Sequence, residues 1–366
     1  MKWSWRLGTV AGIGVYIHAT FLLILGWVVL SHWLQGHTAA ATAGGVLFTL
    51  ALFGCVLLHE FGHALMAKKY GIRTRDITLL PIGGVARLER MPDDPRQELW
   101  VALAGPAVNV AIAAALFAWL TLSQTLEPLE SLGVASGSFW ERLMVLNVFV
   151  VFFNLIPAFP MDGGRVLRAL LAMRLEYTRA TQIAATVGQG LALVFGFVGL
   201  FTNPLLMFIA LFVWIGAGHE ASMVQMKSAL GGIPVSRAMI TDFQTLAEND
   251  TLDVAVSRIL AGSQQDFPVL DDGRVVGVLT RDALLKALTR DGVSASVGAV
   301  MRRDIRQVDA NDMLEMAFAN LQTCDCHTLP VHRNGRLVGL LTADNVGEFL
   351  MIQAAVAGAR AVRNAT

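Results

Sequence analysis

The chain has 366 residues, of which 55% are hydrophobic and only 15% are charged, against about a quarter in ordinary soluble domains. Its 28 basic and 28 acidic residues give a net charge of zero. This balance excludes a disordered chain and argues against a dedicated nucleic-acid binder, so no nucleic acid is expected as a partner. Three cysteines, Cys55, Cys324 and Cys326, are too few for a disulfide framework.

Long stretches of the first half carry no charged side chain, over residues 7–58, 99–126, 143–161 and 180–219. A run of about 20 apolar residues spans a bilayer as a helix. The alternative is a set of buried core helices, but several of these stretches exceed the length of a core helix. The sequence therefore predicts about six transmembrane helices, over 15–34, 43–68, 99–122, 142–158, 181–200 and 204–223.

Basic residues indicate how these helices are oriented, because Lys and Arg gather on cytoplasmic loops. With the N-terminus inside, the inside segments carry every basic residue up to residue 227 except Arg142, which falls at the edge of an outside loop. We expect an integral, multi-pass protein of the cell membrane, in contact with membrane lipid. Both termini are expected in the cytoplasm.

The second half, from about residue 230, is charged again and repeats itself with a period of 62 residues. The matches include Pro268, Gly273, Arg274, Gly277 and Thr280, which recur as Pro330, Gly335, Arg336, Gly339 and Thr342. So many matches at one spacing indicate a duplicated unit, which we read as helix, strand, turn, strand and closing helix. The expected order is a transmembrane α-helical domain over 1–225, a linker over 226–234, soluble α/β repeats over 235–292 and 297–352, and a tail over 353–366.

The sharpest motif is His59-Glu60-Phe61-Gly62-His63, at the end of the second predicted helix. Positions i and i+4 share one helix face, so the two imidazoles can bind one Zn²⁺. Glu60 lies one position off that face, where it can act as general base on a water bound to the metal. Charged and imidazole groups at membrane depth are costly and indicate function. The alternative is a polar cluster at the membrane interface.

Catalytic zinc usually has three protein ligands, so a third ligand is expected. Asp162 is the candidate, in the segment Asn154-Leu-Ile-Pro157-Ala-Phe-Pro160-Met-Asp162-Gly163-Gly164. Its prolines end the fourth helix, and broken backbone at membrane depth is tolerated where it lines a wet cavity or is buried in protein. The alternative is that Asp162 only caps a cytoplasmic helix.

These two segments, HEFGH at 59–63 and NLIPAFPMDGG at 154–164, resemble the site-2 protease family of intramembrane zinc metalloproteases. The resemblance implies that His59, His63 and Asp162 bind one zinc ion and that Glu60 activates water. The substrate would be a transmembrane or juxtamembrane segment of another protein.

Further segments fit the same family. Pro81-Ile-Gly83-Gly84-Val-Ala86 resembles its Gly-Gly sheet segment, and Ala104-Gly-Pro-Ala-Val-Asn109 resembles its Gly-Pro-x-x-Asn helix. The resemblance implies substrate contacts at Gly83, Gly84 and Asn109, and also at Asn154 and Pro157. For Asn109 a hydrogen bond between helices is an open alternative.

The 62-residue repeats resemble a tandem pair of CBS domains, which often bind adenine nucleotides. Thr280 and Thr342 are the candidate phosphate contacts. The usual Asp three residues after each Thr is replaced by Ala283 and Asn345, so a docking or dimerising module without ligand is an equal alternative. A homodimer through the CBS pair is consistent with both alternatives, a pair that binds a nucleotide and a module without ligand.

The expected protein is thus a metalloendopeptidase with a regulatory or docking CBS pair. Two rivals remain, a non-catalytic membrane receptor or scaffold that senses a ligand through the CBS pair, and a transporter gated by it. The four intact residues His59, Glu60, His63 and Asp162 argue against the scaffold, and no inverted repeat supports the transporter. Cys324 and Cys326, next to His327, lack the partners of a zinc site and are expected to be reduced surface thiols.

Overall fold

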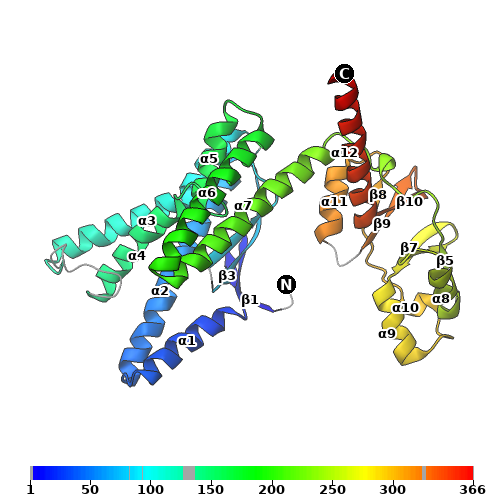
Figure 1. Ribbon diagram of the computed structural model, residues 1–366. Helices are drawn as coiled ribbons and strands as arrows, with labels where there is room; N and C mark the ends of the chain where they lie inside the picture. The colour runs from blue at the N-terminus through cyan, green and yellow to red at the C-terminus, as the bar shows by residue number, and fades with distance from the viewer. Residues whose placement is uncertain (1–2, 82, 93, 127–136, 324–326, 366) are drawn as a thin grey trace. The chain divides into compact units, whose positions relative to one another are not determined.

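A computed structural model describes residues 3–81, 83–92, 94–126, 137–323 and 327–365 (Figure 1). The chain divides into two compact units, Met1–Val224 and Gln225–Thr366. The first unit holds the long apolar helices, and the second holds the repeat. Each unit is described by itself below.

The first unit contains a helix in each of the six predicted places (Figure 1). They are α1 (Phe21–Leu34), α2 (Ala39–Lys69), α3 (Pro95–Leu122), α4 (Phe139–Asn154), α6 (Tyr177–Phe201) and α7 (Pro204–Leu230). Among the described residues, α2, α3, α6 and α7 are long and apolar enough to cross a membrane. The prediction of membrane-capable helices is confirmed. The count of six spans stays a prediction, because α1 and α4 have only 14 and 16 residues.

Large apolar side chains cover the outside of these helices. Leu23, Phe152 and Phe208 are 71%, 71% and 70% exposed. Extended apolar surfaces are rare on soluble monomers and indicate contact with lipid or another protein. The surface of the first unit is therefore that of a membrane domain.

Capping side chains fix where several helices begin. Thr38 accepts a hydrogen bond from the amide of Ala41 at the start of α2, and Asp94 accepts one from Arg96 at the start of α3. At α4, Ser138 and Glu141 bond to each other's backbone amides in a capping box. Such caps satisfy amides that have no partner within the helix, which matters most where water is scarce.

The N-terminal region corrects the first predicted helix. The first helix was predicted to begin at residue 15. Residues 15–18 belong instead to β2 (Ile13–His18), which forms a hairpin with β1 (Ser4–Val10), and α1 begins only at Phe21. The turn uses positive φ at Ala11 and Gly12. Apolar composition alone does not separate strand from helix, and β2 gains partners on both sides because it also pairs with a distant strand.

That distant strand belongs to a sheet of order β1-β2-β3-β4, which includes β3 (Thr74–Leu80) and β4 (Gly83–Leu88). β2 runs parallel to β3, and β4 runs antiparallel to β3 with Ile77 opposite Ala86. Ile77 packs with Phe61 and Ala64 of α2 in one buried cluster. This packing holds β4, an edge strand, beside the part of α2 that carries His59 and His63.

A short helix, α5 (Asp162–Ala172), follows the turn after α4, where a helix was named only in the alternative for Asp162; its N-cap residue is Met161, and no side chain caps it. It packs against α3 and α6. Arg165 and Arg168 stand among its apolar residues, so the sequence gives no signal of a membrane-spanning helix here. Its first residue, Asp162, is buried, so the helix presents this carboxylate to the interior.

The second unit confirms the repeated α/β architecture. Its first sheet has the order β5-β6-β7 and its second β10-β9-β8. Both hairpin turns have consecutive positive φ angles, at Asp272 and Gly273 and at Asn334 and Gly335, as type I′ turns require. The elements are η1 (Val235–Arg237), β5 (Leu246–Ala247), α8 (Leu252–Ala261), β6 (Phe267–Asp271), β7 (Arg274–Leu279), α9 (Arg281–Asp291), α10 (Val297–Val300), β8 (Val308–Asp309), α11 (Leu314–Thr323), β9 (Thr328–Arg333), β10 (Arg336–Thr342) and α12 (Ala343–Ala365).

Two boundaries differ from the predicted ones. Helix α7 continues to Leu230, so the first residues of the expected linker are helical. Helix α12 runs from Ala343 to Ala365, so the expected tail is a continuation of the closing helix. Both segments are rich in good helix formers, Met, Lys, Ala and Leu over 226–230 and Ala, Gln and Arg over 353–365, so the helices continue through them.

Candidate metal centre

Three predicted ligands from two distant segments meet inside the first unit. His59 and His63 lie one turn apart on α2, and Asp162 is the first residue of α5. Each Nε2 atom lies 3.1 Å from Asp162 Oδ2, and the two Nε2 atoms are 3.0 Å apart. All three side chains are buried. Among the described residues they form the one group of His, Cys, Asp and Glu side chains arranged to hold a metal ion.

The outer nitrogens of both imidazoles are bonded to protein oxygens. His63 Nδ1 lies 2.7 Å from the carbonyl oxygen of Val101, and His59 Nδ1 lies 2.6 Å from Asn109 Oδ1. A carbonyl oxygen only accepts, so Nδ1 carries the proton in each neutral ring. Both Nε2 lone pairs therefore point toward Asp162, as zinc-binding histidines require.

This donor set fits a cation. Two bare nitrogens and a carboxylate oxygen face one another in a buried space, where a positive ion between them removes their mutual repulsion. A tetrahedral zinc ion at about 2.1 Å from its ligands separates them by about 3.4 Å, so the cluster needs only a small expansion. Gly105 of α3 leaves the necessary room, because a Cβ there would overlap His63 Nε2 and would lie 2.7 Å from His59 Nε2.

Glu60 is not one of the three clustered ligands, and its carboxylate contacts the sheet. Its Oε2 accepts a hydrogen bond of 3.2 Å from the backbone amide of Ala86 in β4. A Cβ at Gly84 would lie 2.6 Å from Glu60 Cγ, so any larger residue there would force the Glu60 side chain to shift. The predicted Gly-Gly segment is therefore in direct contact with the predicted base. Gly83 has a φ of +140°, which favours Gly whatever the surrounding space.

The Gly-Gly pair after Asp162 has a packing role. A Cβ at Gly163 would overlap the carbonyl oxygen of Ile156, and one at Gly164 would lie 2.6 Å from the amide nitrogen of Phe159. The start of α5 therefore lies directly against the turn that follows α4. Asn154 at the end of α4 is half-buried, and Pro157 is exposed in this turn. Their substrate contacts stay predictions.

Asn109 lies on α3, and its side chain is buried. Its Oδ1 bonds to His59, and its Nδ2 donates to Asn147 Oδ1 at 2.7 Å. The interhelical hydrogen bond named as the alternative is thus present, and it reaches a predicted metal ligand. A substrate contact at Asn109 stays a prediction.

A buried ion cluster beside the site was not predicted. Arg168 of α5 is fully buried and pairs with Glu98 of α3, with Nη2 and Oε1 2.6 Å apart, and with Glu220 of α7, with Nη1 and Oε1 2.5 Å apart. The guanidinium also faces the rings of Phe159 and Tyr177. The cluster ties the helix that begins with Asp162 to two neighbouring helices.

In the second unit, both candidate threonines cap helices. Thr280 Oγ1 accepts from the amide of Ala283, and Thr342 Oγ1 accepts from the amide of Asn345. Asn345 Nδ2 also donates to the carbonyl oxygen of Ala238 at 2.6 Å. Nucleotide binding stays a prediction at both threonines. Cys324 and Cys326 lie outside the described residues.

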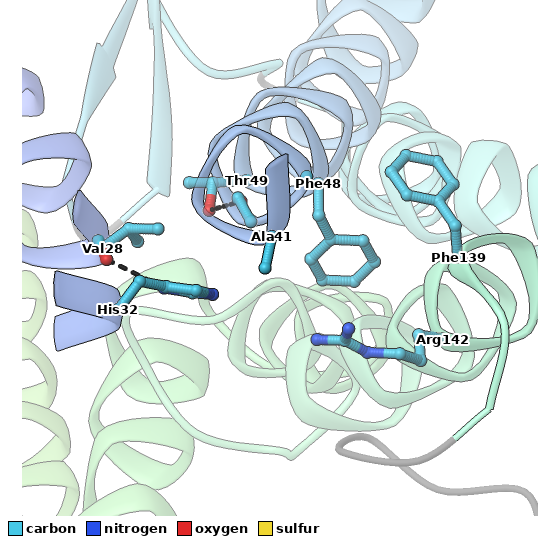
Figure 2. Close-up of a pocket in the computed structure, with 9 residues that line it drawn as sticks. Val28, His32, Ala41, Phe48, Thr49, Phe139 and Arg142 are labelled. Atoms are coloured by element: carbon cyan, nitrogen blue, oxygen red, sulfur yellow. Dashed lines mark hydrogen bonds between the residues drawn. The ribbon is translucent and has the colours of Figure 1, made fainter. Parts of the chain in front are cut away.

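A cavity of about 410 Å³ lies elsewhere in the first unit (Figure 2). Val28 and His32 of α1, Ala41, Phe48 and Thr49 of α2, and Phe139 and Arg142 of α4 line it. Its α2 residues end at Thr49, ten residues before His59. None of the predicted site residues lines this cavity.

Family models and curated relatives match both parts of the chain. Peptidase family M50 matches residues 47–195, and the CBS domain matches 235–290 and 297–351. Zinc metalloprotease MJ0392 of Methanocaldococcus jannaschii is 35% identical over 280 residues, which are 76% of this chain and 78% of that protein. The Synechocystis sp. protein sll0528 is 30% identical over 371 residues, 96% of each chain. A solved structure of the site-2 protease from M. jannaschii is 38% identical with a TM-score of 0.45, and covers 60% of this chain and 95% of that one.

Fold, cluster and relatives together define a zinc metalloprotease of the site-2 protease type, followed by a CBS pair. The chain belongs to peptidase family M50 and is a metalloendopeptidase. Site-2 proteases are membrane proteins, in agreement with the four long apolar helices found among the described residues. The predicted family and enzyme class are confirmed.

Proposed function

We propose that the protein is an intramembrane zinc endopeptidase that hydrolyses peptide bonds within or next to a transmembrane segment of another membrane protein. The observation that carries this proposal is the position of the donor cluster. His59 and His63 lie on α2, a helix long and apolar enough to span a membrane, and Asp162 meets them from α5. Buried ionisable groups in such a helix indicate a functional site.

His59 Nε2, His63 Nε2 and Asp162 Oδ2 would hold one zinc ion. When bound, zinc lowers the pKa of a water toward about 7 and polarises the carbonyl to be cleaved. Three protein ligands leave a fourth position for water or substrate. The chain's own contribution is to aim the two imidazoles by their Nδ1 bonds and to keep the space beside Gly105 open.

Glu60 would act as general base. It is next in sequence to a ligand but is not one of the three, so its carboxylate can take a proton rather than hold the metal. The amide of Ala86 donates a hydrogen bond to one of its oxygens, and the other oxygen would take the proton.

Strand β4 would hold the substrate. A transmembrane helix hides its amides in its own hydrogen bonds and must unwind before hydrolysis. An unwound segment could pair with the edge of a sheet, as in other complexes formed by strand addition. β4 lies at such an edge and contacts Glu60 through Gly84 and Ala86, so a segment bound there would lie next to the base.

We predict that Gly84→Val lowers cleavage of a single-span test substrate in proteoliposomes by at least about ten-fold. The added side chain pushes Glu60 from its place, and a displacement of about 1 Å costs on the order of 10²-fold. Zinc content should not change, because the three atoms nearest to an added Cβ all belong to Glu60, which is not one of the clustered ligands. The matched control is Gly190→Val, where an added Cβ meets no described atom within 4 Å.

The same assay tests the substrate class. Mass spectrometry of the products should place the cut inside or beside the transmembrane segment. Cuts confined to soluble peptides would contradict intramembrane proteolysis, and no cleavage of any substrate by zinc-loaded protein would favour the receptor or scaffold.

The CBS pair would serve as a cytoplasmic regulatory or docking module. Its supporting observation is the separate compact unit, whose two repeats are joined by a hydrogen bond between Asp266 and Thr328, equivalent positions of the repeat. An adenine nucleotide and a homodimer through this pair are part of the proposal. We further propose a multi-pass arrangement with both termini in the cytoplasm, supported by the distribution of basic residues.

A further inference from the structure

We propose that Asn147 of α4 is a positioning residue for the metal ligand His59, and that it acts through Asn109. A chain of hydrogen bonds connects a backbone carbonyl of α4 to the imidazole of α2. The inference rests on the proposed zinc site, and it assigns a role to a residue outside all the motifs that define that site.

The chain has three links. Asn147 Nδ2 donates to the carbonyl oxygen of Leu143 at 2.8 Å. Asn109 Nδ2 donates to Asn147 Oδ1 at 2.7 Å, and Asn109 Oδ1 lies 2.6 Å from His59 Nδ1. Asn147 is fully buried and Asn109 is 1% exposed, so water does not replace any of these bonds.

The carbonyl of Leu143 sets the direction of every link. A carbonyl oxygen only accepts, so the amide end of Asn147 must face it, and the oxygen of Asn147 must face Asn109. Asn109 then has to present its own amide to Asn147 and its oxygen to His59. His59 must therefore carry its proton on Nδ1, which leaves the Nε2 lone pair for the metal.

The second histidine does not need such a relay. His63 Nδ1 bonds directly to the carbonyl oxygen of Val101, which cannot turn around. A side-chain amide can turn by 180° and exchange its donor and acceptor. His59 is held by such an amide, so its orientation depends on the group that fixes the amide, which is Asn147.

The test is the affinity of the full-length, detergent-purified protein for zinc, measured by competition with a chelator. Asn147→Leu keeps a similar volume but removes the partner that orients Asn109. We expect zinc to bind about ten- to a hundred-fold more weakly, the range found when a hydrogen-bond partner of a ligating histidine is lost. The control is Thr181→Val, which removes another buried side-chain hydrogen bond, from Thr181 Oγ1 to Tyr177 O. This control should leave zinc affinity unchanged.

A second background separates positioning from general damage to the fold. In Asn109→Asp, both carboxylate oxygens accept, so His59 has an acceptor whichever way the side chain at position 109 turns. Asn147→Leu should then cause no further loss of zinc affinity when it is added to Asn109→Asp. Gel filtration and thermal melting check that each variant is folded, and the comparison within the Asn109→Asp background carries the test if Asn147→Leu alone does not fold.

Two results would overturn the inference while leaving the metal site intact. One is a zinc affinity of Asn147→Leu within two-fold of wild type. The other is an equal loss from Asn147→Leu in the wild-type and Asn109→Asp backgrounds, which would mean that Asn147 serves the fold alone. Wild-type protein that binds no zinc would overturn the proposed site itself, and the inference with it.

Discussion

Glu60→Gln is expected to abolish cleavage while the protein keeps its zinc. A positioned general base contributes about 10²- to 10⁴-fold to such reactions, and a glutamine amide cannot take the proton. The carboxylate is not one of the three clustered ligands, so its loss leaves the metal donors in place. The measurement is cleavage of a single-span test substrate by wild type and variant, each with its zinc content determined.

The control for this experiment is Glu89→Gln. Glu89 is exposed just after β4, and its replacement by Gln removes one negative charge, as Glu60→Gln does. Its cleavage rate should match that of wild type. Unchanged cleavage by Glu60→Gln would remove Glu60 as the base, and loss of zinc in that variant would mean that Glu60 helps to hold the metal.

Arg168→Met should be the most destabilising single change in the first unit. It leaves Glu98, which is 1% exposed, without its counter-charge, and Glu220 without its ion pair. Breaking one partner of a buried ion pair costs about 3–5 kcal/mol, which corresponds to a fall of about 6–20 °C in melting temperature for a unit of this size. Thermal unfolding of the purified protein in detergent measures it.

A second variant tests the cause of this instability by removing all three charges at once. Glu98→Leu with Arg168→Met and Glu220→Leu removes the cluster without leaving a buried charge, and such replacements are often neutral or stabilising. We expect the triple variant to recover most of the lost stability. If it is as unstable as Arg168→Met, the ion cluster contributes shape or specific hydrogen bonds rather than charge balance.

The grouping of the three candidate ligands could be predicted because its signals are local. The i, i+4 spacing of His59 and His63 needs only a helix to put both rings on one face. Asp162 follows a turn rich in Pro and Gly, which marks the end of a helix in any context. The charge-free stretches likewise indicate the six helices, because hydropathy over about 20 residues is a property of the segment itself.

The N-terminal hairpin could not be predicted in the same way. Residues 13–18 have the apolar composition of a membrane helix, and their strand conformation depends on pairing with β3, whose residues lie about 60 positions further along the chain. Val15 lies opposite Ile77 in this pairing. A partner so distant leaves no mark in the local pattern.

The supporting residues of the site were missed for a related reason. Asn147 is a polar residue within the charge-free stretch 143–161, and an amide at such a position usually bonds across helices. That signal was present, but its partner Asn109 could not be found without the packing of α3 against α4. Arg168 and Glu98 lie 70 residues apart, so their pairing also required the fold.

The most direct test of the central claim is the zinc content of the purified full-length protein beside His59→Ala and Asp162→Ala. About one zinc per chain is expected in wild type, and little or none in either variant, because both remove an atom of the same cluster. His219→Ala, an exposed histidine on α7, should keep the metal. Folded wild-type protein without zinc, or both cluster variants with their zinc intact, would contradict the three-ligand site.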